Sequence, residues 1–140
     1  MWSRVFTLAM ARIVGESGLV IAVDLQKEML RILRKRAEKE NLFSRIKTIQ
    51  ASPDSLNLPS GIQTVFALAF FVIHEVPDQE RLFREIGEAI APGGSLLIAE
   101  PILYVCKSEF QKTIKTADDA GFRPVAESKI PLSRSVLMQK

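Results

Sequence analysis

Apolar residues recur along the chain in two different spacings, and these spacings predict its helices and strands. Apolar positions three or four residues apart predict helices at residues 4–14, at 25–40, around 82–90, and between Ser108 and Gly121. Short, continuous apolar runs predict strands at 19–23, 46–50, 64–73 and 95–100. Two last strands, about 122–130 and 133–139, are separated by the turn Pro131-Leu132. This order predicts an α/β fold with a doubly wound sheet and an antiparallel C-terminal hairpin.

Three local signals predict where individual elements begin and end. Asp78 follows the break Val76-Pro77 and is expected to cap the helix after it. Pro92-Gly93-Gly94 is expected to stop that helix and turn the chain into the strand at 95–100. Ser108 and Gln111 have the spacing of a capping box and predict the start of the last helix.

Length and composition indicate one compact domain of 140 residues, with 47% apolar residues to form a core. No apolar run reaches the roughly 18–20 residues of a membrane span, so a membrane partner is not expected. The net charge of +3 is modest, and glutamates interrupt the basic cluster at 27–39, so a nucleic-acid partner is not expected either. The single cysteine, Cys106, suits a reducing, cytoplasmic location and is expected to be a small, at least half-buried apolar residue.

The run Leu-Val-Ile-Ala-Val-Asp at residues 19–24 carries the first chemical signal. A buried parallel strand that ends in a carboxylate is how nucleotide-binding α/β folds hold ribose hydroxyls, which makes Asp24 a candidate ligand. Such folds carry a glycine-rich turn one strand and one helix earlier, where backbone N–H groups approach the ligand. The only glycines before Leu19 are Gly15 and Gly18, and both follow the first predicted helix.

Four motifs in order make the chain resemble a class I S-adenosylmethionine-dependent methyltransferase of the small-molecule, UbiE-like type. The most specific motif is the passage Ala91-Pro92-Gly93-Gly94-Ser95-Leu96-Leu97-Ile98-Ala99-Glu100-Pro101. The others are Ile73-His74-Glu75-Val76-Pro77-Asp78, Ala120-Gly121-Phe122 and the closing hairpin. The resemblance implies a Rossmann-like methyltransferase sheet, S-adenosylmethionine as cofactor, a small-molecule methyl acceptor and no metal. The hairpin disfavours a nicotinamide-binding domain.

The resemblance also implies roles for individual residues. Asp24 matches the acid that accepts hydrogen bonds from the ribose hydroxyls, although it could instead only cap the next helix. Leu25 would pack beside the adenine, and Ser52 would accept from the adenine amino group, without the charge of the aspartate usual there. Phe70 would flank the methionine part of the cofactor or belong to the core, as would Phe71.

His74, the only histidine, matches a position near the methyl acceptor. It would act as a general base, line the substrate-binding site or have a structural role. Methyl transfer does not require a base. Glu100 would face the same region.

The resemblance further implies that a first strand and its glycine-rich turn are missing before residue 4, so that the sheet is truncated at the N-terminus. Codons for Met1-Trp2-Ser3, read in a shifted frame that starts at the second base (TGT-GGT) with a Ser codon that begins TC, encode Cys-Gly, the first half of the Cys-Gly-Pro-Gly turn common in the family. We hypothesise a frameshift near Val5-Phe6, which sequencing of the upstream DNA would test. The two strands flanking the gap would keep apolar, unpaired edges. We therefore expect a homodimer, stabilised by the N-terminal helix at 4–14 or by the exposed sheet edge.

Two functions follow from these observations. One is methyl transfer to a small molecule, with cofactor binding weakened by the missing turn. The other is a non-catalytic, methyltransferase-like protein that folds and oligomerises without binding the cofactor.

Overall fold

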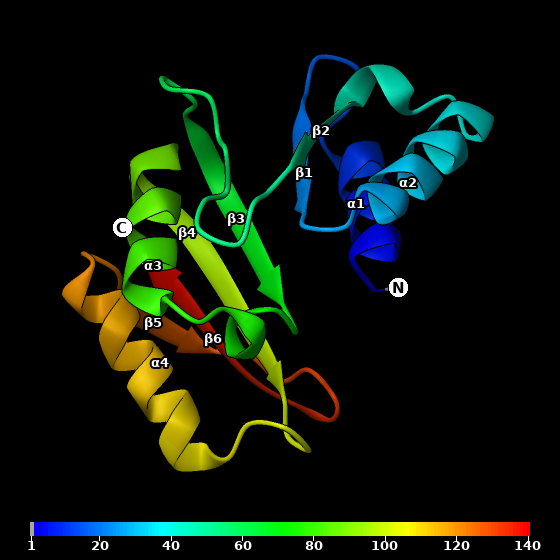
Figure 1. Cartoon of the computed structure of the whole chain (residues 1–140). Helices are drawn as coiled ribbons and strands as arrows, with labels where there is room; N and C mark the ends of the chain where they lie inside the picture. The colour runs from blue at the N-terminus through cyan, green and yellow to red at the C-terminus, as the bar shows by residue number, and fades with distance from the viewer. Residues whose placement is uncertain (1) are drawn as a thin grey trace. The chain divides into compact units, whose positions relative to one another are not determined.

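The computed structural model describes residues 2–140, with side chains from Val5 onward, as an alternation of helices and strands (Figure 1). The elements in chain order are α1 (Trp2–Ile13), β1 (Val20–Asp24), α2 (Lys27–Lys39), η1 (Phe43–Arg45), β2 (Ile46–Gln50), β3 (Thr64–Phe70), η2 (Ile73–Glu75), α3 (Gln79–Ala89), β4 (Ile90–Pro101), α4 (Lys107–Asp119), β5 (Arg123–Glu127) and β6 (Ser133–Gln139). Apart from the two short 3-10 helices η1 and η2, the predicted order of helices and strands is confirmed.

The chain forms two compact units, one that ends at Asn57 and one that spans Leu58–Lys140. In the first unit, β1 and β2 pair in parallel, with Val20 opposite Ile46 and Asp24 opposite Gln50. Buried side chains from α1, α2 and both strands form one core: Leu8, Ala11, Val20, Leu33, Ala37, Leu42 and Ile46. The apolar residues that predicted helices and strands within residues 5–50 therefore pack together in a single small core.

The second unit contains a four-stranded sheet in the order β3-β4-β6-β5. The strands β3 and β4 are parallel, whereas β6 is antiparallel to both β4 and β5, so the predicted C-terminal hairpin is confirmed. The helices α3 and α4 lie side by side, and they contact β4 and β5 respectively (Figure 1). Phe83, Phe122, Ile90 and Leu96 are among its fully buried side chains.

Three predicted strand boundaries are wrong. The hairpin strand predicted at about 122–130 ends at Glu127. Backbone conformation and pairing explain the other two. The strand predicted at 64–73 ends at Phe70, because Phe71 has a left-handed φ of 55° that no regular strand allows. The strand predicted at 95–100 begins at Ile90, directly after α3, because Ile90 already pairs with Thr64. Its register then shifts before Phe66 pairs with Ser95. Pro92-Gly93-Gly94 therefore forms an irregular part of β4 and not a turn before it.

The predicted capping box of the last helix is also wrong. The cap of α4 is Cys106, whose side chain accepts from the backbone N–H of Glu109, while the Glu109 carboxylate accepts from the Cys106 N–H at 2.9 Å. The box thus lies two residues before the predicted one. Cys106 is exposed, contrary to expectation, because a capping residue stands at the open end of its helix. The Asp78 cap of α3 is confirmed, since its carboxylate accepts from the Arg81 N–H at 2.9 Å.

Among residues 2–140, β1 pairs only with β2, and β3 has β4 as its one partner. No helix in this range is long and apolar enough to cross a bilayer. Met1, on which the frameshift hypothesis partly rests, lies outside the described residues.

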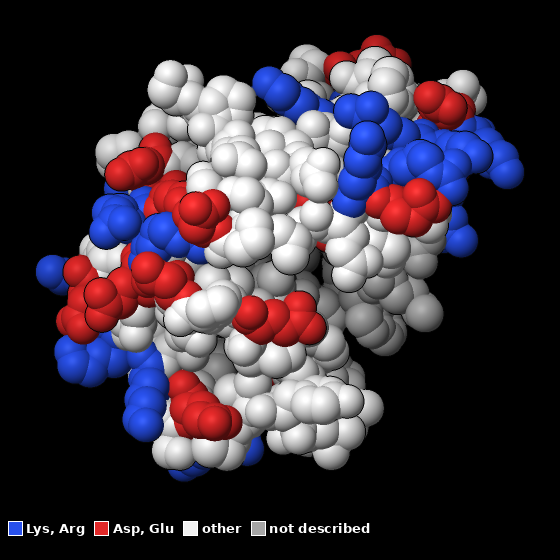
Figure 2. All heavy atoms as spheres, viewed as in Figure 1, with Lys and Arg blue, Asp and Glu red and all other residues white. Residues whose placement is uncertain are grey.

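The positive charge of the chain comes from the first unit, where 10 Lys and Arg residues stand against 6 Asp and Glu residues. Figure 2 shows lysines and arginines gathered over α2, with acidic side chains among them. Two of these basic residues are paired, Arg31 with Glu28 and Arg12 with Glu40. Paired charges of this kind are typical of a solvated helix face.

The Glu109 cap predicts a pH-dependent contribution to stability. The hydrogen bond from the Cys106 N–H holds the pKa of the Glu109 carboxyl below its usual value. A lowered pKa in the folded state stabilises the fold at pH values above the ordinary carboxyl pKa, and this contribution disappears as the pH falls through the folded-state pKa. Glu109→Gln should therefore destabilise the protein at neutral pH and converge with wild type under acid conditions.

Urea unfolding followed by circular dichroism at several pH values measures this effect. The matched control is Glu127→Gln, which alters an exposed glutamate on β5 in the same unit. A difference from wild type that stays constant down to acid pH would contradict the role of the ionised cap.

Candidate functional site

The carboxyl end of β1 presents Asp24 at the start of α2. The Asp24 Oδ1 accepts from the backbone N–H of Gln26 at 2.8 Å. Gln26 is the N-cap of α2 and has no capping hydrogen bond from its own side chain, so Asp24 supplies an acceptor there. Among the described residues Oδ2 has no partner, and it remains available to a ligand hydroxyl. The helix-capping role is thus present, and it uses only one of the two carboxylate oxygens.

Ser52 lies at the same end of this two-stranded sheet because β1 and β2 are parallel and in register. The Ala51 N–H donates to the Asp24 carbonyl at 3.0 Å, which continues the pairing beyond the strands. Ser52 then enters a tight turn, where its hydroxyl donates to the Asp54 carboxylate at 2.8 Å. The hydroxyl proton is therefore used within the turn. The hydroxyl oxygen still has lone pairs with which Ser52 can accept a hydrogen bond, as predicted.

Leu25 follows Asp24 directly and has 53% of its surface exposed. Its carbonyl accepts from the Gln50 side-chain amide at 3.3 Å, which ties the residue after β1 to the last residue of β2. The Leu25 side chain is thus exposed next to the Asp24 carboxylate, which has one oxygen free to accept. This combination suits contact with a flat, partly apolar ligand. The first unit thus brings together three of the predicted residues, Asp24, Leu25 and Ser52.

The carboxyl end of β3 holds the aromatic pair Phe70 and Phe71 in the second unit. Their ring centroids are 4.1 Å apart and the ring planes differ by 20°. Phe70 is half-buried, so it belongs partly to the core and partly to the surface. The left-handed backbone of Phe71 bends the chain out of the sheet and into η2, which carries His74.

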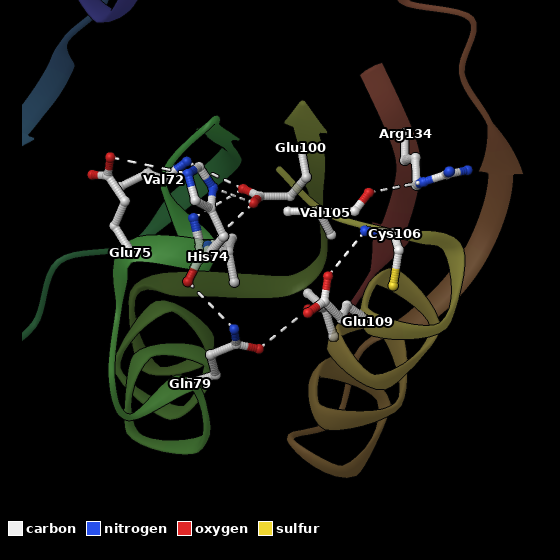
Figure 3. Close-up of polar contacts among 11 residues, drawn as sticks. Val72, His74, Glu75, Gln79, Glu100, Val105, Cys106, Glu109 and Arg134 are labelled. Atoms are coloured by element: carbon white, nitrogen blue, oxygen red, sulfur yellow. Dashed lines mark hydrogen bonds and ion pairs between the residues drawn. The ribbon is translucent and has the colours of Figure 1, made fainter. Parts of the chain in front are cut away.

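Glu100, near the end of β4, is the most buried charged residue between Val5 and Lys140, with 1% of its surface exposed. Its Oε1 accepts from the N–H groups of Val72 and Ile73 at 3.1 and 2.9 Å. Its Oε2 accepts from the His74 N–H at 3.1 Å and lies 2.5 Å from the His74 Nδ1 (Figure 3). Four polar contacts thus satisfy one buried carboxylate, and all four come from the turn at residues 72–74.

Two further groups hold the His74 turn from its other sides. The Gln79 side-chain amide donates to the Ile73 carbonyl at 3.3 Å, and its oxygen accepts from the buried Thr113 hydroxyl at 3.2 Å. The turn is therefore connected to α3 and α4 as well as to β4 (Figure 3). The Tyr104 ring lies 6.1 Å from the His74 imidazole between centroids, with the two planes within 5° of parallel.

The structure places Phe70 and His74 in the second unit, at the carboxyl ends of its parallel strands. Sequence reasoning put Glu100 in the same region as His74, but it did not find their contact. Tyr104 was missed altogether. Its only signal in the sequence is its position four residues after Glu100, within the apolar stretch Pro101-Ile102-Leu103-Tyr104.

Comparison with known proteins settles the family. The sequence model of a family described as "Methyltransferase domain" matches residues 5–94. The chain belongs to this methyltransferase family. Among curated proteins, it is similar to the ubiquinone/menaquinone biosynthesis C-methyltransferase UbiE of Cronobacter sakazakii, with 29% identity over 94 residues. That alignment covers 67% of the chain and 37% of the relative, so the chain spans little more than a third of that protein's length.

Solved structures confirm the Rossmann-like methyltransferase fold of the family. A SAM-dependent methyltransferase from Aquifex aeolicus superimposes with a TM-score of 0.84 at 20% identity, covering 98% of this chain and 77% of that one. The [4+2]-cyclase SpnF superimposes with a TM-score of 0.72, also at 20% identity, over 86% of this chain and 48% of that one. The predicted class I S-adenosylmethionine-dependent methyltransferase family is therefore confirmed, and the cyclase shows that the fold alone does not determine the reaction.

The buried Glu100 predicts a large stability effect. Glu100→Ala removes the acceptor of three backbone N–H groups and of the imidazole, and each buried donor left unsatisfied costs about 1–3 kcal/mol. We expect a loss of about 3–5 kcal/mol in the free energy of unfolding. Urea denaturation followed by circular dichroism measures it. The control Glu88→Ala, at an exposed position of α3, should change stability by less than about 0.5 kcal/mol. Equal effects of the two substitutions would show that the Glu100 contacts do not support the turn.

Proposed function

We propose that the chain transfers a methyl group from S-adenosylmethionine to a small molecule. The observation that carries this proposal is the Asp24 carboxylate at the carboxyl end of β1, with one oxygen accepting from Gln26 and the other available. Bound S-adenosylmethionine would supply an electrophilic methyl group on a positively charged sulfur. Family membership supports S-adenosylmethionine as the cofactor. A small-molecule acceptor is proposed because relatives such as UbiE are methyltransferases of ubiquinone/menaquinone biosynthesis.

The residues of the first unit suit the nucleoside part of the cofactor. Asp24 offers a charged acceptor to a ribose hydroxyl, and a hydrogen bond of this kind contributes about 1.5–3 kcal/mol. The exposed Leu25 side chain offers apolar contact to the adenine, and the Ser52 oxygen is an acceptor for its amino group. For Phe70 and His74 of the second unit, the family resemblance supports roles toward the methionine part of the cofactor and toward the methyl acceptor, respectively.

His74 would take the proton of an acceptor whose hydroxyl or amine attacks the methyl group. The imidazole side chain is 25% exposed, so it is open on one side and held by Glu100 on the other. A base of this kind contributes when the acceptor is weakly acidic, whereas an already ionised acceptor needs only alignment.

The cofactor would bind weakly to this chain. The elements described within residues 2–140 include no glycine-rich turn that joins a strand to α1, and such a turn supplies several N–H contacts at about 1 kcal/mol each. We expect an affinity at least ~10–100-fold below that of a relative with the turn. The second candidate, a folded protein without cofactor binding, rests on this same feature. We also propose a cytoplasmic location, in line with the single exposed cysteine.

Calorimetric titration of S-adenosylhomocysteine into wild type and Asp24→Asn tests the cofactor site. Asparagine keeps an oxygen for the Gln26 N–H but replaces the second acceptor with a donor. We therefore expect a loss of about 1.5–3 kcal/mol, or roughly 10–100-fold in Kd. Asp118→Asn, on the exposed face of α4, is the matched control and should bind like wild type. Heat from wild type that Asp24→Asn leaves unchanged would place the ligand elsewhere, and no heat at all would favour the non-catalytic candidate.

We further propose a two-fold homodimer that pairs the β3 edge of two copies. Among the described residues β3 has one partner strand, its sequence carries no charge, and Val65 is 78% exposed. Uncharged strand edges of this kind pair readily with another copy. Light scattering over a dilution series should give a dimer for wild type and a monomer for Val65→Lys. Val125→Lys, on the hairpin strand β5, should stay dimeric. A wild-type monomer at micromolar concentration would contradict the proposal.

A further inference from the structure

The turn between β3 and η2 is built to hold an anion, and the anion is a side chain of the protein itself. Phe71 has a left-handed φ of 55°, and Val72 follows with φ −127° and ψ −29°. This sequence of conformations turns the N–H groups of three successive residues, Val72, Ile73 and His74, toward one point. Backbone N–H groups arranged in this way form a nest that favours a negative charge. The Glu100 carboxylate occupies the point where they meet.

The hydrogen-bond inventory of Glu100 assigns the proton on the His74 ring. Both carboxylate oxygens already accept from backbone N–H groups, which are donors only. Three backbone N–H donors favour the ionised form of the carboxyl group over the protonated form. With the carboxylate ionised, its contact with Nδ1, at 2.5 Å, requires the imidazole to donate. In a neutral imidazole the proton then sits on Nδ1, and Nε2 carries the free lone pair.

We infer that Glu100 is a positioning residue that locks His74 in the tautomer with the proton on Nδ1 and thereby presents Nε2 as the proton acceptor. The catalytic meaning of this lock rests on the proposed methyl transfer, whereas the tautomer itself follows from the geometry. Glu100 does not touch the reacting atoms in this scheme. It acts through the imidazole and through the turn that carries it.

The proton balance of the step is simple. In the proposed transfer, the hydroxyl or amine of the acceptor would give its proton to Nε2 while its electron pair would form the bond to the methyl carbon. The electrons of the methyl–sulfur bond would stay on the sulfur of the leaving thioether. His74 becomes an imidazolium whose Nδ1–H is still held by the Glu100 carboxylate, an interaction that strengthens as the ring gains charge. A ring with its proton on Nε2 could not accept at that atom.

The surroundings of Nε2 leave it open on the side away from Glu100. The nearest carboxylate oxygen on that side belongs to Glu75, at 4.0 Å, and this side chain is 72% exposed. Glu75 is thus beyond hydrogen-bond distance, while it carries the same charge as Glu100 near the same ring. It provides a control that separates the effect of a nearby charge from the effect of the nest.

The test is nitrogen NMR of uniformly ¹⁵N-labelled protein, which reports directly which ring nitrogen carries the proton. His74 is the only histidine of the chain, so its two ring nitrogens need no assignment among residues. Above neutral pH, wild type should show a protonated Nδ1 and a non-protonated Nε2. Neither cofactor nor acceptor is needed, so a failure here is distinguishable from a failure of cofactor binding in the calorimetric titration.

Two substitutions sharpen the test. Glu100→Gln replaces one acceptor oxygen with an amide donor, which can satisfy Nδ1 only if that nitrogen is unprotonated. We expect the ratio of the two tautomers to move by at least ~10-fold toward the form protonated on Nε2. Glu75→Gln removes the same charge on the other side of the ring and should leave the wild-type pattern unchanged.

Three outcomes would overturn the inference. Wild type with its proton on Nε2 would do so by itself, even if Glu100→Gln fails to fold. A Glu100→Gln variant with native circular dichroism and the wild-type pattern would also do so. The third is an equal change in Glu75→Gln, because it would assign the tautomer to charge in general and not to the nest.

Discussion

The structure of the second unit depends on how it provides hydrogen-bond donors to one buried carboxylate, that of Glu100. A carboxylate that is removed from water is costly unless hydrogen-bond donors replace the solvent, and Glu100 is 1% exposed. Its donors come from the turn after β3, which must leave the sheet at Phe70 and bend sharply to offer them. The end of β3, the left-handed Phe71 and the orientation of His74 are therefore consequences of a single requirement. Hydrogen bonds from Thr113 to Gln79 and from Gln79 to Ile73 connect this turn to α3 and α4.

Much of this architecture could be predicted from the sequence because its signals are local. The amphipathic stripes of α2 and α3, the apolar run of β1 and the cap at Asp78 each require only neighbouring residues to be read. The hairpin β5–β6 was found for the same reason, from two extended runs around Pro131-Leu132. The family was recognised from motifs of this local kind, and the order of the elements followed from them.

The features that escaped prediction depend on partners distant in the chain. Ile90 belongs to β4 because Thr64 lies opposite it, and no pattern around Pro92-Gly93-Gly94 reveals that pairing. The contact of Glu100 with His74 spans 26 residues and requires the parallel register of β3 and β4. The cap of α4 escaped for a different reason, since a cysteine side chain is a weak acceptor and is rarely read as a cap when Ser108 stands two residues later.

The backbone of Phe71 has a consequence for how this protein tolerates change over time. A left-handed conformation costs a residue with a side chain roughly 1–2 kcal/mol, which glycine would not incur. Substitution by glycine relieves that strain, yet it removes the ring stacked on Phe70 and lets the turn visit conformations in which its N–H groups no longer converge. The relief of backbone strain is therefore offset by the lost ring contact and by the greater freedom of a turn whose N–H groups must satisfy a buried carboxylate. Position 71 thus retains a strained aromatic residue because the order of the turn that carries His74 outweighs the strain of one residue.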